Sequence, residues 1–318
     1  MRALVTGAAG FIGSTLSDAL VAAGEEVVGV DCFTPYYERA AKESNLHAAR
    51  SHARFTFIEA DLRTAAIEPL LDGIDVVFHQ AAQAGVRLSW SDGFGDYSTH
   101  NINATQRLLE AAKAAGTGRV VCASSSSVYG NAPRFPTVET DLPRPNSPYG
   151  VTKLAAEHLC NLYAANWGVP TVSLRYFTVY GPRQRPDMAI HRLIEAGLRG
   201  HDFPLYGDGS AVRDFTFVGD VVAANIAAAT ASCPAGTVVN VAGGGSSTMS
   251  ELITLTSELI GAPIALDRRP AQAGDVDRTG GSVELAAELI DWKPVTDVVT
   301  GLERQVSWHR NRVSPREQ

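Results

Sequence analysis

Short apolar runs separated by segments of helical periodicity are the main pattern in the first half of the chain. The runs that predict buried strands cover residues 3–5, 27–30, 55–58, 76–78, 119–123 and 171–176. Helical spacing is clearest after the first run, in a segment that ends near residue 115, and over about 148–167. Strands that alternate with helices in this way predict an α/β fold, a Rossmann-type doubly wound parallel sheet with helices on both faces.

The alternation weakens after residue 180, where proline and glycine become more frequent. We therefore expect residues 1–180 to form a Rossmann domain and residues 181–318 to form most of a smaller C-terminal α/β lobe. Two later segments, near 217–229 and 237–241, have the patterns of a helix and a strand that return to the sheet. A polar insert over 35–52 is too long for a simple connection, so it should carry a short helix of its own.

Composition narrows the class of protein. The 318 residues are 45% hydrophobic and 19% charged, as in ordinary soluble domains, and the formal net charge of -7 argues against nucleic acid as a partner. No apolar run approaches the roughly 20 residues that span a membrane. The chain enters its first strand at once, which predicts no signal peptide. The four cysteines lack the spacing of a metal site or a disulfide framework, so we expect free thiols, no metal and a cytoplasmic location.

Three glycines lie where the first strand should turn into the first helix. Gly7, Gly10 and Gly13 follow the spacing G-x-x-G-x-x-G. In this context Gly7 permits a tight turn, Gly10 lets the backbone approach a diphosphate, and Gly13 lets the helix pack closely on the strand. The helix N-terminus would offer its free N–H groups to the phosphates. The pattern therefore predicts a dinucleotide-binding turn.

An acidic residue ends the second predicted strand. Asp31 stands about 20 residues after the glycines, where a carboxylate accepts the ribose hydroxyls of NAD and repels the 2′-phosphate of NADP. Asp61 and Leu62 follow the third strand and are expected at the adenine edge. A turn or helix-capping role for Asp61 is compatible with that position.

A second group of reactive side chains surrounds Tyr149 and Lys153. These two residues are four apart, so on a helix they share one face. A nearby ammonium should lower the pKa of the tyrosine from about 10 and make it a general base. The serine run 124–127 follows the fifth strand, from which a hydroxyl could reach a substrate oxygen. Such a pair alone is usually a solvated helix face, but the glycine-rich turn favours catalysis.

Several motifs occur in a fixed order along nearly the whole chain. They are TGAAGFIG, Asp61-Leu62, His79-Gln80-Ala81-Ala82, SSSSVYG, Tyr149-x-x-x-Lys153, Tyr176-Phe177-x-Val179-Tyr180-Gly181-Pro182 and Arg213-Asp214-Phe215. Together they resemble the extended short-chain dehydrogenase/reductases of the NAD-dependent nucleotide-sugar epimerase/dehydratase family. The resemblance implies a Rossmann lobe for NAD, a C-terminal lobe for a UDP-sugar, and a homodimer.

The resemblance also assigns roles to individual residues. It implies that Tyr149 is the base, with Lys153 and Ser125 as its catalytic partners. The expected cofactor contacts are Gly7, Gly10, Phe11, Ile12, Gly13, Asp31, Asp61, Leu62, Gln80, Ala81, Ala82, Asn101, Tyr149, Lys153 and Tyr176. The expected substrate contacts are Arg87, Ser126, Ser127, Thr178, Arg185, Arg213, Gln272 and Asp275. Arg213 is expected to hold the nucleotide diphosphate. For a substrate carboxylate, Arg185 is our first candidate cation and Arg87 the second.

Within the family, residues 36–46, 82–87, 181–189 and 272–276 resemble UDP-glucuronate 4-epimerases. Ser126 and Ser127 stand where dehydratases carry an Asp-Glu pair and decarboxylating members carry a glutamate. Two departures, Cys32 after Asp31 and Gly280-Gly281, lie outside the proposed chemistry. We therefore expect NAD-dependent interconversion of UDP-glucuronate and UDP-galacturonate through a 4-keto intermediate. A UDP-glucuronate decarboxylase, a 4-epimerase of UDP-glucose or UDP-N-acetylglucosamine, and a non-catalytic NAD sensor remain alternatives.

Overall fold

A seven-stranded parallel sheet forms the centre of the computed structural model, which describes residues 1–270 and 276–313. The strand order is β11-β6-β5-β4-β1-β2-β3, and every neighbouring pair is parallel. These strands are β1 (Arg2–Thr6), β2 (Glu26–Asp31), β3 (Phe55–Glu59), β4 (Val76–His79), β5 (Arg119–Ser125), β6 (Thr171–Tyr176) and β11 (Thr237–Val241). The predicted fold class is confirmed, and each strand end lies within two residues of its expected position.

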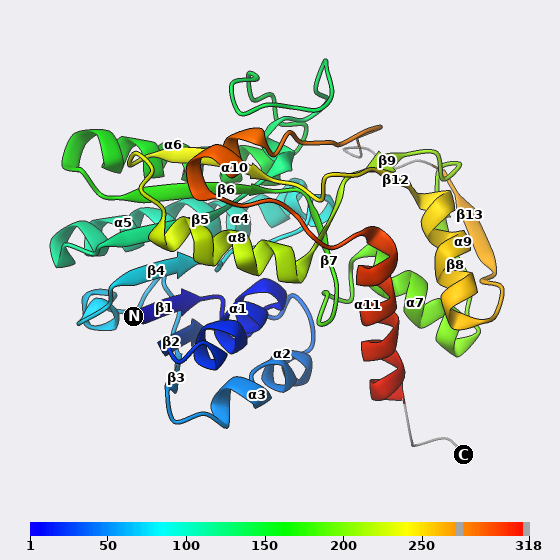
Figure 1. Cartoon of the computed structure of the whole chain (residues 1–318), viewed down its shortest axis with the longest axis horizontal. Helices are drawn as coiled ribbons and strands as arrows, with labels where there is room; N and C mark the ends of the chain where they lie inside the picture. The colour runs from blue at the N-terminus through cyan, green and yellow to red at the C-terminus, as the bar shows by residue number, and fades with distance from the viewer. Residues whose placement is uncertain (271–275, 314–318) are drawn as a thin grey trace.

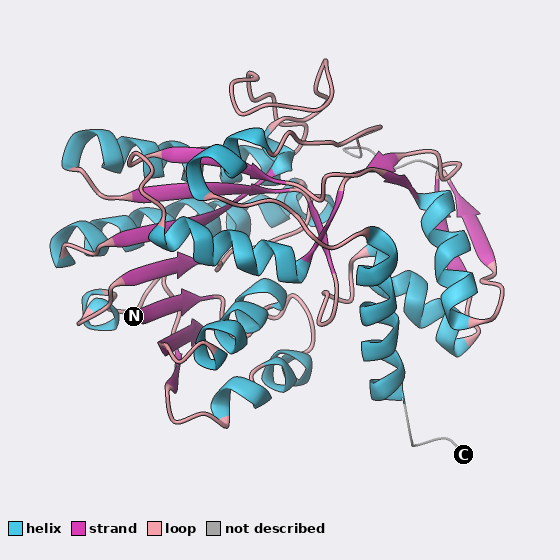
Figure 2. Cartoon of the chain, viewed as in Figure 1, coloured by secondary structure: helices cyan, strands magenta, loops and turns pink. Residues whose placement is uncertain are grey.

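Helices cover both faces of this sheet (Figure 2). On one face α1 (Phe11–Ala22) lies beside α8 (Val218–Thr230), and on the other α5 (Ala104–Ala115) lies beside α6 (Pro148–Trp167). Successive side chains of β1 enter different cores, because side chains of a strand alternate between its faces. Ala3 and Val5 belong to the core under α1 and α8, whereas Leu4 belongs to the core under α5 and α6.

The helix that carries the expected catalytic pair has clear end signals. The Ser147 hydroxyl accepts a hydrogen bond from the Gly150 N–H at 3.1 Å, and Pro148 occupies the first turn of α6. The helix ends at Gly168, whose φ of 67° is in the left-handed region that favours glycine. The expectation of a helix over about 148–167 is thus confirmed.

The insert between β2 and β3 folds as α2 (Arg39–Asn45) and α3 (His47–Arg50), which lie against α1. This confirms that the insert has helical structure of its own. Further short elements lie along the connections from β3 to β4, from β4 to β5 and from β5 to α6. They are η1 (Glu68–Leu71), η2 (Arg87–Ser89), η3 (Ser91–Gly93), α4 (Phe94–Ser98), η4 (Thr99–Asn103) and η5 (Ser126–Val128).

Smaller elements gather beyond the carboxyl ends of the central strands, on the right of Figure 1. The strand pairs are β7 (Thr178–Tyr180) with β10 (Phe215–Phe217), β8 (Phe203–Tyr206) with β13 (Leu266–Arg269), and β9 (Val212–Arg213) with β12 (Ser247–Thr248). The helices after β7, other than α8, are α7 (Ala189–Arg199), α9 (Met249–Ile260), α10 (Glu284–Ile290) and α11 (Val298–Val313).

The chain passes between the sheet and these outer elements more than once. It leaves the sheet after β6, returns through α8 and β11, leaves again for β12 and α9, and comes back to pack α10 against β11 and α8. Among the described residues, no helix combines the length and the apolar character that crossing a bilayer requires.

Candidate active site

The turn between β1 and α1 depends on two glycines for steric reasons. Gly7 has a φ of 69°, and a Cβ at this position would lie 2.8 Å from the Ala81 nitrogen. A Cβ at Gly13 would lie 2.1 Å from the Gly7 carbonyl oxygen. Any larger residue at Gly13 would therefore push α1 away from the turn, which is the packing role predicted for it.

The amino terminus of α1 opens onto a cleft at the carboxyl ends of the central strands. Gly10 precedes the helix, and Gly10, Phe11, Ile12 and Gly13 line the cleft. The first N–H groups of a helix have no partner within it and lie at the positive end of its dipole. Because Gly10 has no side chain to cover them, this end of the cleft suits a diphosphate.

Asp31 ends β2 at the wall of the same cleft. Its Oδ2 accepts a hydrogen bond from the Ala9 N–H at 3.1 Å, and its Oδ1 accepts one from the Phe33 N–H at 2.8 Å. The carboxylate thus ties the glycine-rich turn to the end of β2. Each carboxylate oxygen has further lone pairs, so Asp31 can still accept ribose hydroxyls.

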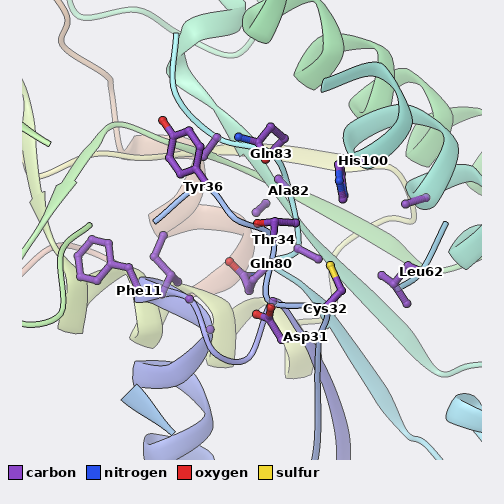
Figure 3. Close-up of a pocket in the computed structure, with 18 of the residues that line it drawn as sticks. Phe11, Asp31, Cys32, Thr34, Tyr36, Leu62, Gln80, Ala82, Gln83 and His100 are labelled. Atoms are coloured by element: carbon purple, nitrogen blue, oxygen red, sulfur yellow. The ribbon is translucent and has the colours of Figure 1, made fainter. Parts of the chain in front are cut away.

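The cleft runs from Asp31 to the start of α6. Figure 3 shows Asp31 and Cys32 near one end of the group, with Tyr36 and Gln83 at the other. Expected cofactor contacts that line it include Asp61, Leu62, Gln80, Ala81, Ala82, Tyr149, Lys153 and Tyr176. The Tyr176 hydroxyl hydrogen-bonds to Gln80 at 3.1 Å and to Asn225 at 3.0 Å, so these walls are fixed by side-chain contacts.

Two expected cofactor residues have structural partners. Asp61 accepts the Arg63 N–H at 2.9 Å and pairs with the Arg63 guanidinium, so it forms a turn at the cleft edge. Asn101 is buried, and its side chain bonds the backbone of Gln83 at 2.8 and 3.0 Å and the Thr152 hydroxyl at 2.9 Å. Asn101 therefore supports the wall that Gln83 forms, and it does not line the cleft itself.

Tyr149 and Lys153 lie on the first two turns of α6, facing the end of β5. The Lys153 ammonium donates to the Ala123 carbonyl at 2.9 Å. Ser125 lies close enough to Tyr149 for its hydroxyl to lower the pKa of the phenol. The first two serines of the run complete β5, and the Ser125 hydroxyl accepts the Ser127 N–H at 3.1 Å. The structure therefore brings the three expected catalytic residues together.

The prediction that Lys153 lowers the pKa of Tyr149 is wrong. Burial raises the pKa of Tyr149, although the Ser125 hydrogen bond and the Arg185 charge both lower it. Burial also lowers the pKa of Lys153 to about 8. The Lys153 ammonium donates to the Ala123 carbonyl, and the charge that lowers the pKa of Tyr149 is that of Arg185.

Arg185 reaches the cleft from the segment between β7 and α7. Its guanidinium forms two hydrogen bonds with Asp187, Nε to Oδ1 at 3.0 Å and Nη2 to Oδ2 at 2.9 Å. The Tyr36 hydroxyl donates to the same carboxylate at 3.2 Å. Tyr36 comes from the insert after β2, so this insert and the segment between β7 and α7 meet at the Asp187 carboxylate.

The other expected substrate residues that the structure describes lie outside the cleft lining. Ser126 and Ser127 form η5, and Thr178 opens β7 with its N–H bonded to the Asp214 carbonyl at 3.1 Å. Arg87 stacks on the Tyr206 ring at 4.4 Å, and Arg213 donates to the Val212 carbonyl at 3.0 Å. Gln272 and Asp275 lie outside the described residues.

A buried ion pair beneath α6 was not expected from the sequence. Glu157 and Arg175 are 3% and 5% exposed, and Arg175 Nε donates to Glu157 Oε2 at 3.0 Å. The Ser124 hydroxyl donates to the same oxygen at 2.9 Å, and Arg175 donates to the Tyr129 hydroxyl at 2.7 Å. Glu157 lies four residues after Lys153 on the same helix face, so its spacing could have revealed this supporting role.

Comparison with known proteins gives a consistent result. Residues 3–242 match the model of the "NAD dependent epimerase/dehydratase family". The chain is 41% identical over 309 residues to an uncharacterized UDP-glucose epimerase, YtcB, of Bacillus subtilis (97% of this chain, 98% of the relative). It is 39% identical to a UDP-glucose 4-epimerase of Mycolicibacterium smegmatis (98% and 99%). A solved UDP-glucuronic acid 4-epimerase of Bacillus cereus, in complex with UDP-glucuronic acid and NAD, is 39% identical with a TM-score of 0.95 (98% and 100%).

Proposed function

Because the chain belongs to the NAD-dependent epimerase/dehydratase family, we propose that it interconverts UDP-glucuronate and UDP-galacturonate with tightly bound NAD. The α1 N-terminus, with Gly10 before it, would hold the diphosphate of NAD, and Asp31 would accept its ribose hydroxyls. NAD supplies the hydride acceptor and donor that oxidation and reduction at C4 require. No net redox change occurs in an epimerisation, so the cofactor should remain bound between turnovers.

The residues at the start of α6 would move the proton. Tyr149 takes the proton of the C4 hydroxyl as a phenolate and returns it at the end of the cycle. Ser125, which lies beside Tyr149, donates its hydroxyl proton to the same substrate oxygen. Lys153, one turn further along α6 and held by the Ala123 carbonyl, would donate to a ribose hydroxyl of the cofactor. Arg185 stabilises the phenolate electrostatically.

The observation that carries the choice of a uronate is the position of Arg185. A guanidinium in the cleft wall, close enough to act on Tyr149, suits a carboxylate next to the reacting carbon. We propose that the hydroxyls of Ser126, Ser127 and Thr178, which lie outside the cleft lining, hold that carboxylate without repelling it once substrate is bound. A 4-keto uronate is a β-keto acid, so restraint of the carboxylate would protect it from loss as carbon dioxide.

A 4-epimerase of UDP-glucose is the second candidate. The relative at 39% identity bears that name, and the relative at 41% identity is named an uncharacterized UDP-glucose epimerase. Asp187 also neutralises part of the Arg185 charge that a uronate would meet. A UDP-sugar is the expected substrate in either case, and a homodimer in the cytoplasm is the expected form of the protein.

Product analysis separates these functions. The purified protein, without added cofactor, should convert UDP-glucuronate to UDP-galacturonate by NMR, and should release almost no carbon dioxide per product formed. Faster conversion of UDP-glucose would support the second candidate. Carbon dioxide release on most turnovers would identify a decarboxylase, and no turnover of any UDP-sugar would overturn the enzymatic proposal.

A further inference from the structure

The guanidinium of Arg185 is only partly available to a ligand. Asp187 occupies one complete edge of it, through Nε at 3.0 Å and Nη2 at 2.9 Å. Such a two-point contact fixes the plane of the guanidinium as well as its charge. Among the described residues no hydrogen-bond partner of Nη1 is found, so this end of Arg185 is the one left for substrate.

Asp187 is itself held by a residue of the insert after β2. The Tyr36 hydroxyl donates to Asp187 Oδ2 at 3.2 Å, and the Tyr36 ring lies 5.7 Å from the Arg185 guanidinium carbon. Close backbone approach fixes Tyr36 in turn, since a Cβ at Gly85 would come within 2.3 Å of its hydroxyl oxygen. Gly85 has a φ of 98°, a conformation that favours glycine.

Asp187 carries a negative charge at this position. Burial works against ionisation, but the Arg185 charge and hydrogen bonds outweigh burial and lower the pKa of Asp187. A uronate entering the cleft would therefore meet an arginine whose charge is largely balanced. The affinity for a neutral UDP-hexose would depend little on the net charge of this pair.

We propose that Asp187 is a specificity-determining residue that sets how strongly, and at which end, Arg185 binds a substrate carboxylate. By occupying the Nε–Nη2 edge it directs the carboxylate to Nη1 and weakens the preference for anionic over neutral UDP-sugars. The inference deepens the proposed function and rests on its placing of the sugar beside Arg185. It assigns Tyr36 the role of anchoring Asp187 from the insert after β2.

Equilibrium binding tests this proposal without depending on turnover. Dissociation constants for UDP-glucuronate and UDP-glucose would be measured by calorimetry on the NAD-loaded protein. Asp187→Asn keeps an acceptor for Arg185 and Tyr36 but removes the charge. It should shift the affinity ratio toward UDP-glucuronate by roughly 3- to 10-fold, with UDP-glucose changed less than about twofold.

Three further variants control for fold and for net charge. Asp187→Glu retains the charge and should keep the wild-type ratio. Asp187→Ser removes the charge in another way and replaces the asparagine variant if that one does not fold. Asp72→Asn makes the same change in net charge at an exposed loop beyond η1 and should alter neither affinity.

An unchanged ratio in Asp187→Asn, or equal weakening of both ligands, would overturn the inference, because a purely structural role affects both ligands alike. A shifted ratio in a protein that epimerises only UDP-glucose would refute the proposed substrate and leave the role of Asp187 intact. The experiment therefore distinguishes a wrong role for Asp187 from a wrong substrate.

Discussion

Removal of the charge of Glu157 should destabilise the protein more than any exposed charge change. Glu157 and Arg175 are almost fully buried, and Glu157 also accepts the Ser124 hydroxyl. In Glu157→Gln the Arg175 guanidinium would remain buried without a compensating carboxylate. Breaking a buried pair in this way typically costs about 3–5 kcal/mol of unfolding free energy.

The size of the chain converts this cost into a temperature. The unfolding entropy of globular proteins is about 2.1 cal/mol/K per residue, which is about 0.7 kcal/mol/K for 318 residues. Glu157→Gln should therefore lower Tm by about 4 to 7 °C. Thermal unfolding of the NAD-loaded protein, followed by circular dichroism at fixed protein concentration, measures the shift.

A matched control is the exposed pair Arg39–Glu59. Both side chains are about half exposed, at 52% and 50%, so Glu59→Gln should leave Tm nearly unchanged. The double variant Glu157→Leu with Arg175→Met removes both buried charges and should recover much of the loss. A Tm of Glu157→Gln within about 1 °C of wild type would refute the reasoning, since it would show that Arg175 does not depend on this carboxylate.

Three other predictions address the cleft and the core. Tyr149→Phe should reduce turnover by about 10²–10⁴-fold with UDP-sugar affinity by calorimetry nearly unchanged; more than half of the wild-type activity would mean that another residue is the base. Asp31→Asn should lower the affinity for NAD and reduce the ratio of NAD affinity to NADP affinity in fluorescence titrations. Unchanged affinities for both cofactors would show that Asp31 does not contact the ribose. Burial lowers the pKa of His79 to about 3, below the value of about 6.5 in an unfolded chain, so the unfolded state binds more protons between those pH values. Unfolding free energy should fall as pH drops through this window, and His79→Gln should reduce the slope in urea unfolding from pH 7 to 4 by up to about 1.4 kcal/mol per pH unit; equal slopes would contradict a buried neutral imidazole.

The parts of the site that depend on neighbouring residues could be predicted from the sequence. The glycine-rich turn follows from spacing between a strand and a helix, and Gly13 has the steric role expected of it. Tyr149 and Lys153 share a helix face because they are four residues apart, and α6 has the predicted ends. Local periodicity and chain geometry are sufficient for such features.

The electrostatics of the site could not be predicted in the same way. Lys153 is close to Tyr149 along the helix and donates to a carbonyl of β5, whereas the charge that lowers the pKa of Tyr149 is that of Arg185, from the segment after β7. Likewise, the contact between Tyr36 and Asp187 joins residues 151 positions apart. Sequence spacing carries no information on burial or on which distant carboxylate an arginine meets.

The repeated passage of the chain between the sheet and the outer elements limits how such a protein can be recombined. Exchange of everything after residue 180 for the corresponding part of another enzyme would also replace β11, the edge strand paired with β6, and α8, which packs on α1. A chimera designed to change sugar specificity would therefore need several junctions, so that these two elements stay with their own sheet. Substrate preference in this architecture is more readily altered by point substitutions at the cleft than by transfer of a whole segment.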